Sequence, residues 1–332
     1  MPFDRSVSVI IPVHNGADFI GTALQSLERQ VSDPARMQVV IIDDGSTDRT
    51  GDIAREFGDR LGEMVILRNE SPQSVGTARV QGLKAADREY IAFLDADDWM
   101  APGRLDHLMA RCDELGVDFV RTDHVRAFET GQPREIHRAP EGRRDVPIAA
   151  RDAILPTNHA SLVDYPFPWA GIFHRRLVDD GRLAYDEGLH SFEDRVAIWR
   201  LALSDATVAV VDAPWIVYRR DVGTSLTQVF DRRQLAFIDG FALVRDLVMA
   251  RDEDRVFEAK VIRQFLAIAA HHVARDRGMS HADRRLLRAS IREFATTLDR
   301  EPLAKEWEAI GMARRSQLGP AILPVLKEKA SA

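Results

Sequence analysis

Residues 38–48 read QVVIIDDGSTD, a run of apolar and β-branched residues that ends in acidic and turn-forming residues. Similar runs occur at 7–12, VSVIIP, and at 90–98, YIAFLDADD. Runs that are almost continuously apolar are typical of strands buried on both faces of a sheet. Amphipathic helical stretches lie between them. The alternation predicts an α/β fold with a parallel sheet that carries helices on each side.

The remaining pattern extends this prediction along the chain. Helices are expected at 17–30, 47–57, 75–86, from 102 to about 115 and at 193–203, and strands at 64–68, 118–122, 207–211 and 215–219. Residues 123–150 are polar and predict a loop or a hairpin excursion. From about residue 231 only helical patterns remain, so we expect two parts, 1–230 and 231–332.

The helices expected in 231–332 have apolar faces too large to be left exposed to water. They must pack on the first part, on each other, or on another subunit as a homo-oligomer. The last segment, LGPAILPVLKEKA, combines an apolar run with two lysines. Burial against the protein is favoured for it over contact with a membrane surface, because two cations give little membrane binding.

Composition excludes several classes of protein. The chain has 332 residues, is 45% hydrophobic, and carries a formal net charge of −7, which gives no reason to expect nucleic-acid binding. A single cysteine, Cys112, rules out an internal disulfide, and neither a signal peptide nor a membrane span is recognisable. We expect a cytoplasmic protein with at most peripheral contact with the inner face of the membrane.

Two acidic clusters follow predicted strands, and ligands of such sheets bind beyond the carboxyl ends of the strands. They are residues 43–48, DDGSTD, and 95–98, DADD. In an extended segment Asp95 and Asp97 would point to the same side and could hold a divalent cation or a ribose. For residues 46–48 the favoured interpretation is local, as turn formers and helix caps.

Four strings in this order resemble the nucleotide-binding half of the inverting family 2 glycosyltransferases with the GT-A fold. They are VSVIIPVHNGADFI, VVIIDDGSTDRT, GTARVQGLKAA and YIAFLDADDWMAPGRL, within residues 6–105. A looser likeness at 169–203 includes Glu193-Asp194 at a helix start. The sequence after residue 169 is most similar to enzymes of bacterial surface polymers, including teichoic-acid-type glycosyltransferases.

This resemblance implies a nucleotide-sugar donor, with a UDP-sugar preferred, held by residues 1–105. The donor-binding residues would be Pro12, Val13, His14, Asn15, Asp43, Arg79, Asp95 and Ala96. Asp43 would accept a hydrogen bond from the uracil, Arg79 would face the diphosphate, and Asp97 would ligate Mn²⁺ or Mg²⁺. His14 stands where tyrosine is usual in the family, and Val80 replaces the usual asparagine.

Residues 106–230 would then bind the acceptor, a glycan or a surface polymer. Asp194 would be the base that deprotonates the acceptor hydroxyl, and Glu193 would orient the site. The alternative for both is that they complement the dipole of their helix. Trp169 and Arg219 are expected to border the acceptor, with core packing as an equal alternative for Trp169; core packing is expected for Trp215.

The function implied is that of a metal-dependent inverting glycosyltransferase. One alternative is a sugar-phosphate nucleotidyltransferase, which would be expected to carry a glycine-rich loop with Arg and Lys after the first strand. Here HNGADF, at 14–19, stands in that place. The other alternative is a non-catalytic member of the same fold that binds a nucleotide or polymer.

Overall fold

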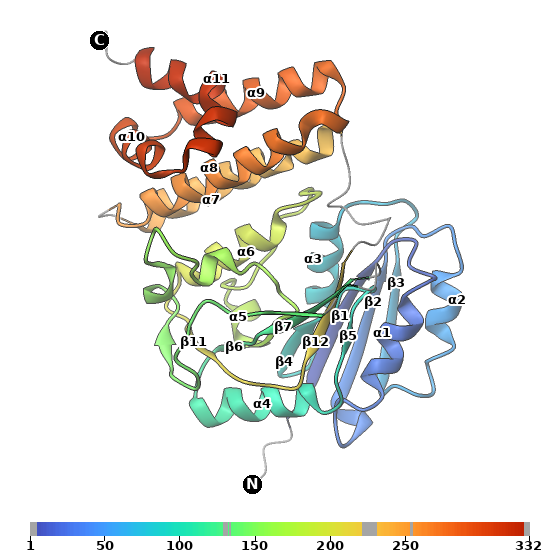
Figure 1. Ribbon diagram of the computed structural model, residues 1–332. Helices are drawn as coiled ribbons and strands as arrows, with labels where there is room; N and C mark the ends of the chain where they lie inside the picture. Colours follow the sequence, from blue (N-terminus) through green and yellow to red (C-terminus); the bar gives the residue numbers. More distant parts are fainter. Residues whose placement is uncertain (1–4, 129–131, 133, 221–230, 253–254, 329–332) are drawn as a thin grey trace.

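The computed structural model describes residues 5–128, 132, 134–220, 231–252 and 255–328. Its first part is an α/β unit, and the helices α7 to α11 form a layer over one side of it, next to α6 (Figure 1). The boundary expected near residue 230 lies outside the described residues. The division into 1–230 and 231–332 therefore stays a prediction.

The core of the first part is an eight-stranded sheet in the order β3-β2-β1-β4-β10-β6-β11-β9. The strands in that order are Glu63–Arg68, Met37–Asp43, Val7–Val13, Tyr90–Phe93, Gly171–His174, Phe119–Arg121, Thr207–Val210 and Ile148–Ala149. The strands β3, β2, β1 and β4 are parallel, as the sequence predicts. β3 is half-exposed, because it lies at the edge of the sheet.

The expectation of a mostly parallel sheet is confirmed, but the sequence pattern did not reveal its antiparallel strands, β10 and the edge strand β9. β10 lies antiparallel between β4 and β6, so the sheet is mixed. The backbone approaches very closely here, since a Cβ atom on Gly171 would lie 2.0 Å from the carbonyl oxygen of Val120. A four-residue strand whose fit depends on a glycine gives no periodic signal in the sequence.

Helices cover the sheet in the way that right-handed crossover connections require. In Figure 1, α1 and α2 lie on one side of the sheet, and α3, which packs on β1 and β2, lies on the other. The fourth helix, α4, packs against β10 and β6. Their bounds are Ile20–Leu27 for α1, Thr50–Arg55 for α2, Val75–Ala85 for α3 and Arg104–Leu115 for α4.

A second, four-stranded sheet has the order β5-β12-β7-β8. Its strands are Trp99–Met100, Ile216–Arg220, His124–Phe128 and Glu135–His137. The antiparallel pairing of β7 with β8 shows that residues 123–150 include the expected hairpin. The prediction that Trp215 packs in the core is wrong: Trp215, the residue before β12, is 42% exposed.

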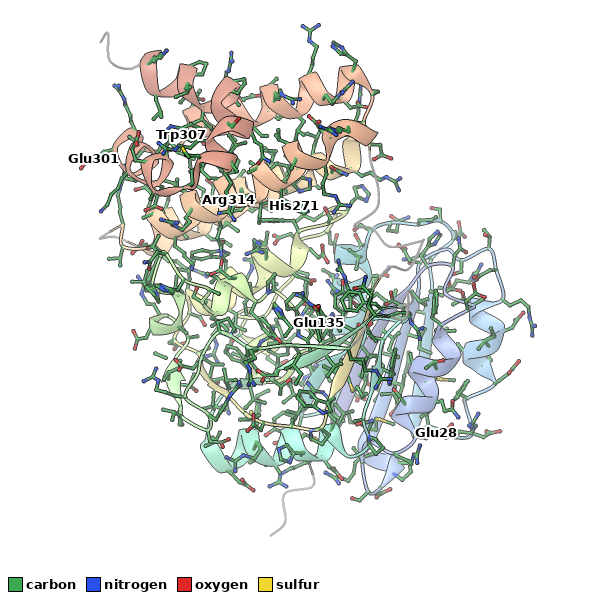
Figure 2. All side chains as sticks on the ribbon, viewed as in Figure 1. Glu28, Glu135, His271, Glu301, Trp307 and Arg314 are labelled. Atoms are coloured by element: carbon green, nitrogen blue, oxygen red, sulfur yellow. The ribbon has the colours of Figure 1, made fainter. Side chains whose placement is uncertain are left out.

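The helical layer is built on a shared aromatic core. Phe265 packs on Phe241 and Phe294, with ring centroids 5.6 and 4.6 Å apart. Trp307 lies within the layer and Glu301 at its outer edge (Figure 2). The helices are α7 Ala236–Arg251, α8 Glu258–Arg275, α9 His281–Thr296, α10 Arg300–Ala309 and α11 Met312–Glu328.

The described part of the C-terminal segment is mostly buried. Leu318 and Ile322 of α11 are fully enclosed, as the preference for burial over membrane contact predicts, although Leu323 is 42% exposed. Across the described part of the chain, every helix is too short or too polar to cross a bilayer.

Replacing Gly171 with alanine tests the close packing of β10. The added methyl group would collide with the Val120 backbone and separate β10 from β6, which we expect to cost about 3 kcal/mol of the free energy of unfolding. Urea unfolding of the variant measures this cost. Gly142→Ala, at an exposed glycine with open space around its Cβ, is the control and should change stability by less than about 0.5 kcal/mol. Equal effects of the two changes would contradict the packing argument.

Candidate active site

The carboxyl ends of three parallel strands meet in one row. Val13 of β1 is aligned with Asp43 of β2, and Asp43 is aligned with Arg68 of β3. On the other side of β1, Ile10 is aligned with Phe93 of β4, so Asp95 lies near the level of Pro12. The structure therefore brings the residues predicted to bind the donor to a single edge of the sheet.

The loop after β1 is tied to the loop after β2. Asn15 has a left-handed φ of 50°, and its backbone N–H donates to the Ser46 hydroxyl over 2.9 Å. His14 Nδ1 lies 2.8 Å from the carbonyl oxygen of Asp44. Asp48 accepts from the backbone N–H of Thr50 at the start of α2, which agrees with the turn and capping roles expected for residues 46–48.

Asp43 is buried beneath this loop and has two partners. Its Oδ1 accepts the backbone N–H of Ser46 over 2.9 Å, and its Oδ2 forms an ion pair with Arg68. The partnership with Arg68 was not predicted, because it depends on the register between β2 and β3. Pairing with Arg68 means that a nucleobase at Asp43 would meet a carboxylate already fixed in orientation.

One face of α3 carries the residues that connect the two halves of the site. Gly76, Arg79 and Gly82 are spaced by three and therefore lie on one side of the helix. A Cβ on Gly82 would lie 2.3 Å from the side chain of Ile10 in β1, and one on Gly76 would lie 2.7 Å from the carbonyl oxygen of Asp186. These two close approaches hold Arg79 between the sheet and the segment that leads into α6.

Arg79 joins acids from both halves of the site. Its Nη1 donates to Glu193 and to Asp194, the first two residues of α6 (Glu193–Ala202), and its Nη2 lies 3.2 Å from Oδ1 of Asp95. The Arg79 side chain is only 3% exposed, whereas those of Asp95 and Asp194 are 32% and 25% exposed. One buried guanidinium thus links the donor-side acid to the predicted base.

The charges in this cluster act on one another. Burial raises the pKa of Asp194 and of Glu193 above the usual carboxyl range, and the charge of Arg79 counteracts the rise. Burial alone would lower the pKa of Arg79, but the two acids hold it above its ordinary value. Arg79 is therefore a permanent cation, and Asp194 is a carboxylate with more proton affinity than an exposed aspartate.

The segment from Asp95 to Asp98 is a turn, so the prediction of an extended segment is wrong. The backbone N–H of Asp98 donates to the carbonyl oxygen of Asp95 over 3.0 Å and closes it. The acids still influence one another: burial, followed by the charge of Asp95, raises the pKa of Asp97 to about 6. Asp98 is fully buried, and its Oδ2 has no hydrogen-bond partner among the described residues.

The acids of this turn fit a divalent cation whose remaining coordination positions are filled by a bound ligand. Asp95, Asp97 and Asp98 lie within one turn, and Oδ2 of Asp98 is buried without a hydrogen-bond partner among the described residues, so carboxylate oxygens are available to a cation here. Among the described residues, however, no three acidic, histidine or cysteine side chains are arranged to hold a metal by themselves. Hard cations bound by one or two carboxylates are usually completed by phosphate oxygens and water.

Of the two residues expected to border the acceptor, Trp169 follows its alternative of core packing, and Arg219 lies at the acidic turn. Trp169 is 2% exposed and packs against Tyr218, with ring centroids 5.1 Å apart, so its observed place is in the core. Arg219 supports the acidic turn: its Nε donates to the carbonyl oxygen of Asp97 over 2.9 Å, and its backbone N–H donates to Asp98. Their roles at the acceptor stay predictions.

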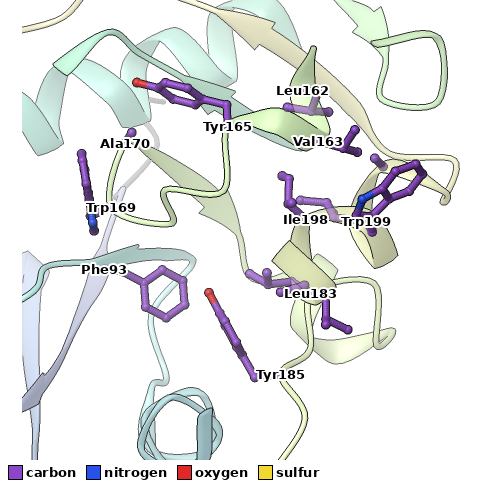
Figure 3. Close-up of a cluster of buried hydrophobic side chains, with 14 of the residues drawn as sticks. Phe93, Leu162, Val163, Tyr165, Trp169, Ala170, Leu183, Tyr185, Ile198 and Trp199 are labelled. Carbon is purple, nitrogen blue, oxygen red and sulfur yellow. The ribbon is translucent and has the colours of Figure 1, made fainter. Parts of the chain in front are cut away.

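A small apolar cavity lies behind Asp194, with room for about one water molecule. Tyr185 and Leu183 line it, and Figure 3 shows the Tyr185 ring beside Phe93. Arg121 also reaches the cavity from β6, where it is 1% exposed. No sequence pattern singles out Arg121, because its strand resembles any other strand of the sheet.

The mostly parallel sheet, its acidic strand ends and the ion-paired acids of α6 define the class of GT-A glycosyltransferases. The sequence model of Glycosyl transferase family 2 matches residues 8–170, so this part of the chain is a domain of that family.

Two curated relatives and one solved structure set this membership in context. The chain is 27% identical to EpsH of Bacillus subtilis over 72% of its own length and 67% of EpsH. It is 23% identical to TarS of Staphylococcus aureus, a poly(ribitol-phosphate) β-N-acetylglucosaminyltransferase, over 78% of its length and 43% of TarS. It thus spans about two thirds or less of these relatives.

The structural likeness is more extensive than the sequence likeness. The crystal structure of S. aureus TarS 1–349 in complex with UDP-GlcNAc has a TM-score of 0.74 to this chain. The alignment covers 98% of this chain and 92% of that one, at 18% sequence identity. At this identity the likeness establishes the fold, helical layer included.

Replacing Arg79 with methionine tests whether the guanidinium neutralises the acids of α6. Without it, the pKa values of Glu193 and Asp194 should rise further above those of the unfolded chain, near 4. The folded state then binds more protons than the unfolded state, so stability is lost as pH rises from about 4 through the raised values. We expect a cost of about 3 kcal/mol at pH 7.5 and a smaller one at pH 5, measured by urea unfolding.

The matched control is the triple variant Arg79→Met, Glu193→Gln, Asp194→Asn, which removes both buried charges. It should recover most of the stability lost at pH 7.5 and show little of the pH dependence. A cost for Arg79→Met that is equal at both pH values would contradict the proposed neutralisation.

Proposed function

We propose that this chain is an inverting glycosyltransferase that moves a sugar from a UDP-sugar to a hydroxyl group of a glycan or cell-surface polymer. The observation that carries the proposal is the position of Arg79, which contacts Asp95 on the donor side and Asp194 at the start of α6. A transferase of this kind needs the leaving diphosphate and the proton acceptor within one sugar ring of each other.

Asp194 is the proposed base. Its side chain is 25% exposed, so an acceptor hydroxyl can reach it, and Arg79 holds it in one orientation. The oxygen of the acceptor forms the new bond to the anomeric carbon as the bond from that carbon to the phosphate oxygen breaks. The hydroxyl proton passes to Asp194, and the electron pair leaves with the nucleoside diphosphate. A single displacement of this kind inverts the anomeric centre.

The donor is proposed to bind along the strand ends, from Asp43 to Asp95. Arg79 contacts Asp95 at one end of this row, and a guanidinium is suited to phosphate oxygens. Asp95 and Asp97 would hold a Mn²⁺ or Mg²⁺ ion, which supplies positive charge for the diphosphate when bound. Asp98 and Arg219 keep the turn that carries Asp97 in place through the contacts described above.

A polymer of the bacterial surface is the proposed acceptor class, supported by the relationship to TarS. Residues 123–150 contain arginines of the kind that would contact a phosphate-bearing polymer. Arg144 pairs with Asp123 and Arg143 with Glu141, so these two cations are already neutralised within the protein. Contacts with an anionic acceptor are therefore expected elsewhere on the rim of the site.

Asp97→Asn tests the proposed cation site. The substitution keeps the shape of the side chain and removes the charge that the cation needs, so the heat of UDP binding should lose its dependence on Mn²⁺. Release of nucleoside diphosphate from a panel of nucleotide sugars should fall about 100-fold or more. Isothermal titration calorimetry and the release assay measure the two effects. Asp52→Asn, at an exposed acid of α2, is the control; full activity of Asp97→Asn would remove the metal assignment.

Asp194→Asn tests the proposed base. Loss of a positioned base costs about 10²- to 10⁴-fold in rate, and we expect transfer to fall in that range while UDP affinity stays within twofold of the wild type. In the wild type, kcat/KM should rise with pH through the raised pKa of Asp194, because only the carboxylate accepts a proton. A parallel loss of UDP affinity would show that Asp194 belongs to the donor site instead.

A further inference from the structure

Gly240 of α7 lies in direct contact with Phe192, the residue before the acids of α6. A Cβ atom on Gly240 would lie 2.3 Å from Cδ1 of Phe192, 3.0 Å from its Cγ and 3.2 Å from its Cβ. Gly240 is buried in the middle of a sixteen-residue helix, where glycine costs stability relative to alanine. The aromatic ring therefore rests on the bare backbone of α7, and any larger residue at 240 would displace it.

Phe192 has a backbone conformation that its side chain does not favour. It caps α6 with φ 74° and ψ −3°, in the left-handed region that aromatic residues rarely adopt. Such a conformation costs on the order of 1 kcal/mol and persists only where the surroundings determine it. Its ring also contacts that of Phe241, with centroids 4.7 Å apart, and lies 5.4 Å from the guanidinium of Arg195.

The backbone angle at Phe192 sets the direction in which α6 begins. Glu193 and Asp194 follow it directly, and both reach Arg79 from the first turn of the helix. A rotation at residue 192 would move the two carboxylates together relative to Arg79 and Asp95. The contact with Gly240 is thus two residues along the chain from the proposed base, although α7 itself supplies no group to the acid cluster described above.

A second contact holds α6 farther along. Trp199 Nε1 donates to Gln264 of α8 over 2.9 Å, and Gln264 donates to Asp164 over 2.6 Å. Lys260, one turn earlier in α8, is 1% exposed and lies 2.6 Å from the same carboxylate. With one contact at its start and one near its end, α6 has a fixed rotation against the helical layer.

We propose that the helical layer orients the base of this enzyme, and that Phe192 and Gly240 are the positioning residues through which it does so. The inference rests on the proposed function, because it assigns a purpose to the orientation of Asp194. It goes beyond that function by making α7, more than forty residues downstream in the sequence, a support that positions the catalytic centre. Removing or moving α7 would alter catalysis before it altered donor binding.

Gly240→Ala is the variant that tests this. The new methyl group must push the Phe192 ring away, and a misplacement of about 1 Å can cost up to about 100-fold in rate. We expect kcat for the sugar transfer to fall tenfold or more, while UDP affinity measured by calorimetry stays within twofold. Gly319→Ala in α11, also a buried helical glycine but with only Leu323 Cδ1 near its Cβ, at 3.6 Å, should leave kcat unchanged.

A double-mutant cycle separates positioning from general damage to the fold. In a Phe192→Ala background the atoms at 2.3 and 3.0 Å are gone, so adding Gly240→Ala should lower kcat by less than twofold more. If the two substitutions instead multiply, or if Gly240→Ala lowers UDP affinity as much as kcat, the positioning role is wrong. Thermal unfolding shows whether each variant is folded at the assay temperature.

Phe192→Leu extends the test to a change that adds no atoms. The substitution removes the far ring atoms, and we expect it to lower kcat while UDP affinity stays unchanged. This test remains valid even if Gly240→Ala does not fold. A wild type that releases no nucleoside diphosphate from any nucleotide sugar would overturn the proposed function and this inference together. An active wild type with an unchanged kcat in folded Gly240→Ala would overturn this inference alone.

Discussion

The buried guanidinium of Arg79 is the interaction on which the rest of this structure depends. It lies among three carboxylates from two separate segments, namely Asp95 after β4 and Glu193 and Asp194 at the start of α6. Two of these acids would be costly to bury as charges without a cation, and a buried cation would be as costly without them. The cluster therefore forces the sheet, α3 and α6 to meet at one point.

Two glycines of α3, which carry no functional group, allow the sheet, α3 and α6 to come this close. Gly82 lets α3 approach Ile10 of the sheet, and Gly76 lets the start of the same helix approach the segment before α6. Arg79 lies between these glycines on the same helical face. The string GTARVQGL thus serves two purposes, because its glycines set the distances at which the arginine between them can reach acids on both sides.

Much of the sheet and of the site could be predicted from local pattern. Apolar runs ending in acids locate β1, β2 and β4, and the likeness to family 2 indicates Asp43, Arg79, Asp95 and Asp194. What could not be predicted depends on contacts between distant segments. The insertion of β10, the pairing of Arg68 with Asp43 and the exposure of Trp215 follow from register and packing, and none of these leaves a periodic trace. The turn at residues 95–98 was missed because aspartates suit both extended and turn backbones.

The two constraints on Asp194 act on different degrees of freedom. The ion pair with Arg79 attracts the carboxylate but tolerates rotation, since a guanidinium offers five N–H groups to a nearby acid. The contact of Phe192 with α7 is steric and fixes the direction of the backbone, but it is indifferent to charge. In the proposed mechanism, neither constraint alone would hold the base against the anomeric carbon with the accuracy that a single displacement needs. The ion pair from the sheet side and the steric contact with the helical layer together would do so, and this is the reason we propose for an arginine at 79 and a glycine at 240.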